Sequence, residues 1–400
     1  MKRDHRFSGL IWVLMGLLAV LHQSSCSYDS FTEWIDGSSH DERIFRLNPS
    51  SEYDSLMFAL KPNMAPNVVS LLWFTDVHKN LANLRRVLLW YNHYRDCFDD
   101  IISTGDQQDS FFTQDFGWWS ENDAGGVLQT IGNHDSWISK TMYEEGDYEG
   151  DIVSSYGKAA PFWILSQKDT YDKFISSFIG GWDVIQPESS SVIGKCYYYK
   201  DYDNLRLIVL DCMHYGTEDD LDENKNSRQD KWFRMLLDDA CDKRIPVVAV
   251  SHFAPAYTTP ISCSYTYKGT TGKFSDRLNS SAYKRVKAFI DKGGEFVCWL
   301  AGHIHVDVIG TVEADMRQPV IICATANEQR STKIPRFKDT KMQDSFNCIS
   351  FDTEQKQIYI VKVGADQNED NERKRVVRYN YSDYVDNEGN THKRGLVCSY

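Results

Sequence analysis

The 400-residue sequence predicts a mixed β-sheet fold with helices packed on the outside. Between residues 67 and 131, short apolar runs rich in strand-forming residues alternate with a helix-like segment, which is the rhythm of β-α-β units. Further apolar runs recur later in the chain, and polar residues collect where these runs end. In open α/β sheets such strand ends form functional sites, so the same pattern indicates where a site would lie.

Composition restricts the class of protein. The sequence is 42% hydrophobic and 25% charged, which is typical of a globular protein, and it is long enough to bury a full core. Its formal net charge is -13 and it contains no long basic block, which argues against binding to a nucleic-acid duplex. An anionic substrate would need a local source of positive charge in such a chain.

The first 26 residues have the order of a secretory signal peptide. Lys2, Arg3 and Arg6 precede an apolar run of 13 residues (9–21), which is shorter than the ~20 residues that span a bilayer as a helix. Small residues follow. We therefore expect an exported chain, secreted or periplasmic, with no transmembrane span after processing. Cys26 leaves a lipoprotein signal open, in which this cysteine would carry a lipid anchor.

The elements of the first half follow in order. Residues 27–66 are polar and contain three prolines, which predicts an irregular N-terminal segment. Strands are predicted at 67–74, 99–104 and 125–131, and a helix at 80–94 with Asn80 as its N-cap. The rhythm then breaks at 136–196, an aromatic and loop-like insert.

The second half returns to regular structure. A hairpin is predicted at 195–211 and another at 348–364, buried strands at 246–252, 295–305 and 319–326, and helices at 228–244 and 282–294. Residues 365–400 form a charged, then tyrosine-rich tail with a possible terminal strand. The main domain is thus expected over 67–364. Cys298 and Cys323 lie in apolar runs, where cysteine packs as a small hydrophobic residue, and no metal-type cysteine spacing is present.

Five polar motifs follow five different apolar runs. They contribute Asp76 and His78 (FTDVH), Asp106 (STGDQQD), Asn133, His134 and Asp135 (IGNHD), His252 (VSHFAP), and His303 and His305 (AGHIH). Taken singly, an aspartate after a strand is often a turn residue, and a lone histidine is often structural. Together they supply the carboxylate, imidazole and amide groups that bind Mn, Fe or Zn ions. There are enough of them for two ions, provided that one carboxylate bridges.

In this order the motifs resemble those of the calcineurin-like metallophosphoesterases. The resemblance implies a two-sheet mixed β-sandwich flanked by helices, with a dinuclear metal site at the strand ends. It implies that Asp76, His78 and His305 bind the first divalent ion, that Asn133, His252 and His303 bind the second, and that Asp106 bridges. His134 would face the substrate as a catalytic residue, oriented by Asp135.

The resemblance implies hydrolysis of a small phosphorylated substrate, a mono- or diester, by a hydroxide that the two metals activate. A metal-binding scaffold or binding protein without turnover is the alternative, because a fold does not guarantee activity. The insert lies next to the third motif, and its Phe162, Trp163 and Trp182 are candidates for substrate contact, although ordinary packing over the sheet edge is the better explanation of them. The sequence leaves metal identity and oligomeric state open.

Overall fold

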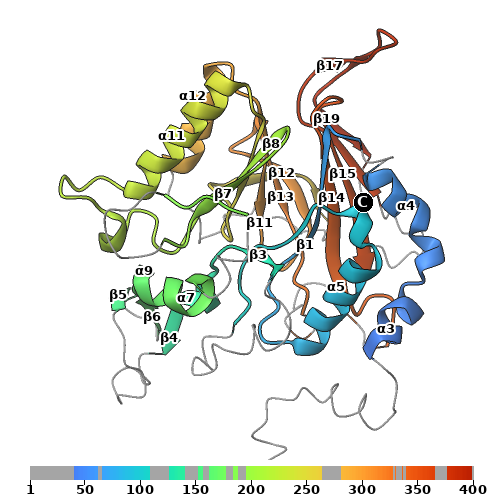
Figure 1. The fold of residues 1–400 in the computed structure, drawn as a ribbon, viewed down its shortest axis with the longest axis horizontal. Helices are drawn as coiled ribbons and strands as arrows, with labels where there is room; N and C mark the ends of the chain where they lie inside the picture. The colour runs from blue at the N-terminus through green and yellow to red at the C-terminus, as the bar shows by residue number, and fades with distance from the viewer. Residues whose placement is uncertain are drawn as a thin grey trace, which may run out of the picture.

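The computed structural model describes residues 40–61, 65–108, 126–139, 152–155, 162–176, 183–187, 195–263, 281–327, 329, 336, 339–364 and 376–398. The predicted signal peptide, with Cys26, lies outside these residues. The prediction of mixed sheets with helices outside is confirmed (Figure 1). Within the described residues, no helix is both long and apolar enough to cross a membrane.

The first sheet has seven strands in the described part of the chain, in the order β19-β16-β15-β14-β1-β2-β3. The β1, β2 and β3 strands are parallel to one another, and the other neighbours are antiparallel. The strands are β1 (Val68–Phe74), β2 (Asp100–Ser103), β3 (Leu128–Gln129), β14 (Ser345–Asp352), β15 (Gln357–Gly364), β16 (Val376–Asn380) and β19 (Gly395–Cys398).

The second sheet also has seven strands among the described residues, in the order β10-β12-β13-β11-β9-β8-β7. Its centre is parallel, with β8, β9, β11 and β13 running the same way. The strands are β7 (Tyr198–Tyr202), β8 (Leu205–Val209), β9 (Val247–Val250), β10 (Thr258–Cys263), β11 (Phe296–Ala301), β12 (Val308–Val312) and β13 (Asp315–Ile322).

One buried hydrophobic cluster contains side chains from both sheets. Trp73 of β1 and Cys348 of β14 belong to the same cluster as Val248 of β9, Cys298 of β11 and Ile321 of β13, and none of the five is exposed. Full burial of one large aliphatic side chain stabilises a fold by roughly 1.5–3 kcal/mol, so this shared core ties the two sheets together. Cys298 and Cys323 pack in it as small hydrophobic residues, as predicted.

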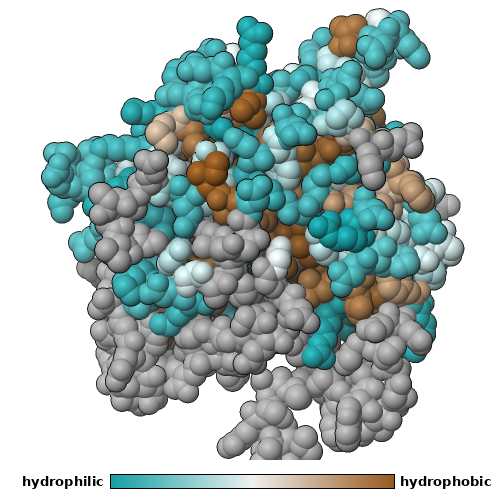
Figure 2. Space-filling view, in the orientation of Figure 1, coloured by the Kyte–Doolittle hydropathy of each residue, from teal (hydrophilic) through white to brown (hydrophobic). Residues whose placement is uncertain are grey.

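Helices cover the outer faces of the sheets. α4 packs against β14 and β15, α3 packs on α5, and α11 and α12 lie on the side of the second sheet (Figure 1). Asn80 caps α5 as predicted, because its side chain accepts a hydrogen bond from the Asn83 N–H. These helices are α3 (His40–Leu47), α4 (Asp54–Leu60), α5 (Leu81–His93), α11 (Arg228–Lys243) and α12 (Ser281–Asp291). Hydrophilic residues cover most of the coloured surface in Figure 2.

Three sequence expectations need correction. The segment 27–66 is not irregular throughout, because α3 and α4 form within it and bury Ile44, Met57 and Leu60 in the main core. Pro49 lies just before the 3-10 turn η1 (Ser50–Glu52), between the two helices. The tail is not separate from the domain, since β16 and β19 extend the first sheet, and the terminal strand that was predicted there is present.

The insert is also more ordered than a loop. It forms a small sheet in the order β4-β6-β5, followed by α9 and a π-helical turn, η6. These elements are β4 (Trp137–Ser139), β5 (Ile152–Ser155), β6 (Phe162–Leu165), α9 (Gln167–Thr170) and η6 (Tyr171–Ile175). Shorter elements elsewhere are η3 (Arg95–Cys97), α7 (Asn133–Ser136), η7 (Glu218–Asp220), β17 (Tyr384–Val385) and β18 (Thr391–His392).

Candidate metal centre

The five polar motifs meet at one place because each follows a strand that ends there. The first three follow β1, β2 and β3, which are parallel neighbours in the first sheet. The other two follow β9 and β11, which are parallel neighbours in the second. The carboxyl ends of parallel strands lie at one edge of a sheet, so residues far apart in the sequence come together between the two sheets.

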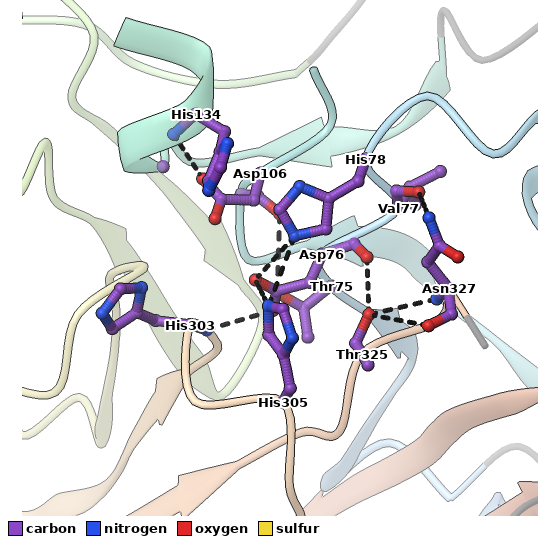
Figure 3. A network of polar contacts seen from close by, with 12 residues as sticks. Thr75, Asp76, Val77, His78, Asp106, His134, His303, His305, Thr325 and Asn327 are labelled. Carbon is purple, nitrogen blue, oxygen red and sulfur yellow. Dashed lines mark hydrogen bonds and ion pairs between the residues drawn. The ribbon is translucent and has the colours of Figure 1, made fainter. Parts of the chain in front are cut away.

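The first ligand group consists of Asp76, His78 and His305 (Figure 3). The Asp76 Oδ1 atom lies 3.2 Å from His305 Nε2 and 3.8 Å from His78 Nε2. The two imidazole Nε2 atoms are 3.3 Å apart. The three side chains therefore direct one oxygen and two nitrogens at a common point, as ligands of one cation do.

The second group is built around His252, which is fully buried. Its Nδ1–H donates to the Thr104 carbonyl over 2.7 Å, which leaves the lone pair of Nε2 available. That Nε2 atom lies 3.1 Å from Asn133 Oδ1 and 3.2 Å from Asp106 Oδ2. His303 belongs to the same group, with ligand atoms of Asp106, His252 and His303 all within 4.8 Å of one another.

Asp106 is shared between groups. Its carboxylate also lies within 4.8 Å of His78 and His134 ligand atoms, so it stands between the first group and the second. The structure thus brings all seven predicted ligand residues together with His134. His134 is close enough to Asp106 to be a metal ligand. Its expected role as a catalytic residue that faces the substrate therefore stays a prediction.

Two carboxylate oxygens in the centre show that a cation fits. Asp76 Oδ2 accepts from the Thr75 hydroxyl at 2.7 Å and from the His303 N–H at 3.0 Å, and Asp106 Oδ1 accepts from the His134 N–H at 2.8 Å. The other oxygens, Asp76 Oδ1 and Asp106 Oδ2, are buried and accept no hydrogen bond. A buried charged oxygen without a partner is costly, and a metal ion would satisfy both.

The charges of the centre agree with this arrangement. Burial alone would raise the pKa of Asp76, but neighbouring His305 outweighs it and holds that pKa below its ordinary value. For Asp106 burial is likewise outweighed, mainly by His252, so its pKa lies well below the usual range. Burial lowers the pKa of His252 but the Asp106 carboxylate raises it to about 9. The position beside Asp106 therefore favours a positive charge, supplied by a proton or by a cation.

At His78 burial outweighs the nearby carboxylates, and the pKa falls to about 4. A neutral imidazole presents a lone pair, which is the form that binds a metal.

The backbone of the centre is held in an uncommon conformation. Asp76, His78, Asp106, His303 and His305 all have positive φ, between 48° and 72°. Such angles cost of order 1–3 kcal/mol for residues other than glycine and persist at functional sites where the surrounding structure fixes them. The strand ends therefore turn sharply to direct these side chains inward.

Two glycines let the strand ends come close to the carboxylates. A Cβ on Gly132 would lie 2.2 Å from Asp106 Oδ1, and one on Gly302 would lie 2.9 Å from Asp76 Oδ2 and 2.1 Å from Thr75 Oγ1. No side chain fits at either position.

Asp135 has different contacts from those expected. Each of its carboxylate oxygens accepts two main-chain N–H groups, from Gly132 and Asp106 on one side and from Gln107 and Gln108 on the other, all at 2.9 Å. Burial and the nearby Asp106 charge raise its pKa. The carboxylate thus holds the loop that carries Asp106, and the orientation of His134 that we expected from Asp135 is not among these contacts.

The aromatic candidates of the insert are placed only in part. Trp163 lies on β6, half-buried, opposite Ile138. The side chain of Phe162, and Trp182 altogether, lie outside the described residues. Sequence reasoning missed Trp137, whose ring centroid is 5.4 Å from that of His134. Its place directly after the third motif was the available signal.

Sequence reasoning also missed the loop after β13. Thr325 Oγ1 donates to the Asp76 carbonyl at 2.7 Å, and Asn327 Nδ2 donates to the Val77 carbonyl at 3.0 Å (Figure 3). These bonds fix the strained backbone that carries Asp76 and His78. No local sequence signal identifies them, because the partners are about 250 residues apart.

Comparisons with known proteins yield remote structural likenesses. No family model and no curated protein matches the sequence. Among solved structures, the chain is similar to a dimetal phosphatase from Danio rerio, at 13% identity and a TM-score of 0.43, over 74% of this chain and 96% of that one. It is also similar to the sulfate thiohydrolase SoxB of Thermus thermophilus, at 11% identity and a TM-score of 0.29, over 67% of this chain and 39% of that one. In the order of its five motifs and in their assembly at one place, the chain resembles the calcineurin-like metallophosphoesterases.

Proposed function

We propose that this protein is a metal-dependent hydrolase that cleaves a phosphate ester at the centre formed by the five motifs. The observation that carries the proposal is the pair of buried oxygens, Asp76 Oδ1 and Asp106 Oδ2, which accept no hydrogen bond and face imidazole nitrogens from other strands. Two divalent cations, when bound, would hold the phosphate and lower the pKa of water, so that hydroxide is available as the nucleophile at neutral pH. They also supply the positive field that a chain of net charge -13 needs around an anion.

In this proposal the residues of the centre have different roles. Asp76, His78 and His305 would hold one ion, Asn133, His252 and His303 would hold the other, and Asp106 would be shared by both groups. His134, which is partly exposed at the edge of the centre, stabilises charge on the phosphate and donates a proton to the leaving oxygen, a contribution of typically 10²–10⁴-fold. The core shared by the two sheets supports the sandwich architecture that the resemblance implies.

The proposal includes the cellular location of the protein. The order of basic, apolar and small residues in 1–26 supports export of the chain, with a lipid anchor at Cys26 as a further arrangement. A small phosphorylated molecule is the proposed substrate. A scaffold that binds metal without turnover is the second candidate, and the presence of His134 beside the ligand groups favours the enzyme over it.

The test is turnover of p-nitrophenyl phosphate and bis-p-nitrophenyl phosphate by the chain without residues 1–26, with Mn²⁺ added. The Asp106→Ala protein serves as the blank, and metal content is measured in both. Turnover above the blank supports the hydrolase, and the ratio of the two rates separates monoesterase from diesterase. Bound metal without turnover of either ester would favour the scaffold.

A further inference from the structure

A second buried pair of aspartate and histidine lies outside the metal centre. Asp211 follows β8, and His214 follows three residues later, and neither side chain is exposed. His214 Nδ1 lies 2.7 Å from Asp211 Oδ2, and His214 Nε2 lies 2.8 Å from the Leu165 carbonyl. The proposed reaction does not use this pair.

The partners of His214 determine its protonation. A carbonyl oxygen only accepts, so Nε2 must carry a hydrogen. Nδ1 faces a carboxylate, which also accepts when ionised, and Asp211 Oδ1 already accepts the Met213 N–H at 3.0 Å and the His214 N–H at 3.2 Å. Both ring nitrogens therefore donate, and the pair is an imidazolium beside a carboxylate. Burial works against this charge, but Asp211 outweighs it and raises the pKa of His214.

The pair joins the insert to the second sheet. Leu165 is the last residue of β6, and the next element of the insert is tied to the same loop, because the Gln167 N–H donates to Asp219 at 2.8 Å and its side-chain amide lies 3.4 Å from Asp211. Lys195 donates to Gln167 Oε1 at 2.9 Å. Polar contacts with the loop after β8 and with Lys195 thus hold the end of β6 and the start of α9 in place.

The insert in turn supports His134. β6 pairs with β4 in the register Ile164↔Trp137, and β4 follows directly after the helical turn α7 that carries His134. The Trp137 and His134 rings lie 5.4 Å apart. A continuous set of contacts therefore runs from His214 through β6 and β4 to the side chain that we propose as the proton donor.

We propose that Asp211 and His214 are positioning residues that anchor the insert and thereby hold His134 in place over the metal centre. This inference rests on the proposed function for its catalytic part, whereas the anchoring is a property of the fold alone. Among the described residues, the other charged or titratable groups around the pair include Cys212, Asp219 and Asp220 on its own loop, Lys195, Cys196 and Tyr197 before β7, and Asp172 in the insert. Asp211 is the one that touches the ring.

The experiment compares wild type, His214→Gln and Asp211→Asn by hydrogen exchange of the β4 and β6 amides, and by turnover with Mn²⁺ on phenyl phosphate and p-nitrophenyl phosphate. Phenolate is the poorer leaving group and depends more on proton donation. The control is His392→Gln, which removes a histidine 2.8 Å from an aspartate, Asp386, on the protruding β17–β18 hairpin. Wild-type protein labelled with ¹⁵N-histidine reports ring protonation without any substitution.

We expect faster exchange in β4 and β6 of both variants, unchanged metal content, and a turnover loss about tenfold larger on phenyl phosphate than on p-nitrophenyl phosphate, since proton donation contributes 10²–10⁴-fold. Exchange unchanged in β4 and β6, an equal loss on both esters, or a neutral His214 ring in the wild type at pH 6 would overturn the inference. If the wild type hydrolyses neither of these esters nor bis-p-nitrophenyl phosphate, the proposed function fails, and exchange still decides whether the pair anchors the insert.

Discussion

At the scale of single residues, Asp106 has the largest number of roles in the centre. One of its oxygens accepts the His134 N–H and the other lies 3.2 Å from His252 Nε2. We expect Asp106→Ala to remove turnover and to lower bound metal at both positions, because the two ligand groups share this carboxylate. Metal analysis and ester turnover on the same sample check this, with Asp291→Ala on the surface of α12 as control. Near-full activity would show that Asp106 does not bridge.

His134 separates two roles that the geometry permits. If it donates a proton, His134→Ala should retain both metals and lose about 10²–10⁴-fold in turnover on phenyl phosphate, with a smaller loss on p-nitrophenyl phosphate. If it is a ligand, as its place near His78 and Asp106 allows, metal content should fall together with turnover on both esters. Metal analysis of the variant distinguishes the two.

At the scale of elements, close approach of strand ends is the feature that forms the centre. Gly132→Ala should abolish metal binding or destabilise the fold, since the new Cβ would lie 2.2 Å from Asp106 Oδ1. Gly126→Ala, shortly before β3, is the matched control, because a Cβ there has no atom within 4 Å. Thermal unfolding and metal content check both variants. A stable Gly132→Ala protein with full metal content would contradict the close packing.

The anchor of the insert has a pH dependence with a defined sign. The pKa of His214 is raised in the folded protein above its ordinary value of 6.5, so its contribution to stability is fully present below that value. The contribution is lost as the pH rises through the raised pKa. The difference in unfolding free energy between wild type and His214→Gln should therefore be largest near pH 6 and shrink in alkaline buffer. Urea unfolding across this pH range measures it, and a difference that grows with pH would contradict the assignment.

How far the sequence predicts these elements depends on whether the signal is local. β9 is apolar along its whole length, β1 is apolar except for Ser70, and α5 has its own cap, so each can be identified alone. The motif residues follow from those strands, because a polar side chain at the end of an apolar run identifies its own position. The candidate residues of the five motifs were therefore available without a structure, whereas their division into ligands of two ions is what the family resemblance implies and stays a prediction.

The missed elements depend on distant partners. β10 contains Pro260 and forms only because β12 pairs with it, with a register shift at that point. The small insert sheet requires β4 and β6 to meet across more than twenty residues. The contact of Thr325 with the Asp76 carbonyl and the main-chain contacts of Asp135 depend on how the loops are folded, which neither residue type nor spacing reveals.

At the scale of the whole molecule, the metal centre lies where the two sheets meet. Its residues directly follow β1, β2 and β3 of one sheet and β9 and β11 of the other. Any ion held there binds the folded chain alone, because the unfolded chain does not bring these groups together. Ligand binding at 100 times its Kd stabilises a protein by about 2.7 kcal/mol.

Removal of metal should therefore lower the stability of the entire domain. We expect chelation to lower Tm by about 3–4 °C per ion at such saturation, and Mn²⁺ to restore it. Calorimetry with and without EDTA measures this shift. The Asp106→Ala protein, which should hold little metal, is the control and should show almost no change. An equal shift in the variant would mean that metal stabilises the protein elsewhere.

Chemical modification of the cysteines buried between the sheets also reports when the two sheets separate. Cys298 on β11, Cys348 on β14 and Cys323 directly after β13 are fully buried in the main core, and burial raises the pKa of each thiol, whereas Cys398 is exposed. A maleimide pulse should therefore modify Cys398 within seconds and reach the three core thiols only when the sheets separate. The rate of that slow modification measures the rate of unfolding. Its dependence on Mn²⁺ would show how strongly bound metal slows unfolding.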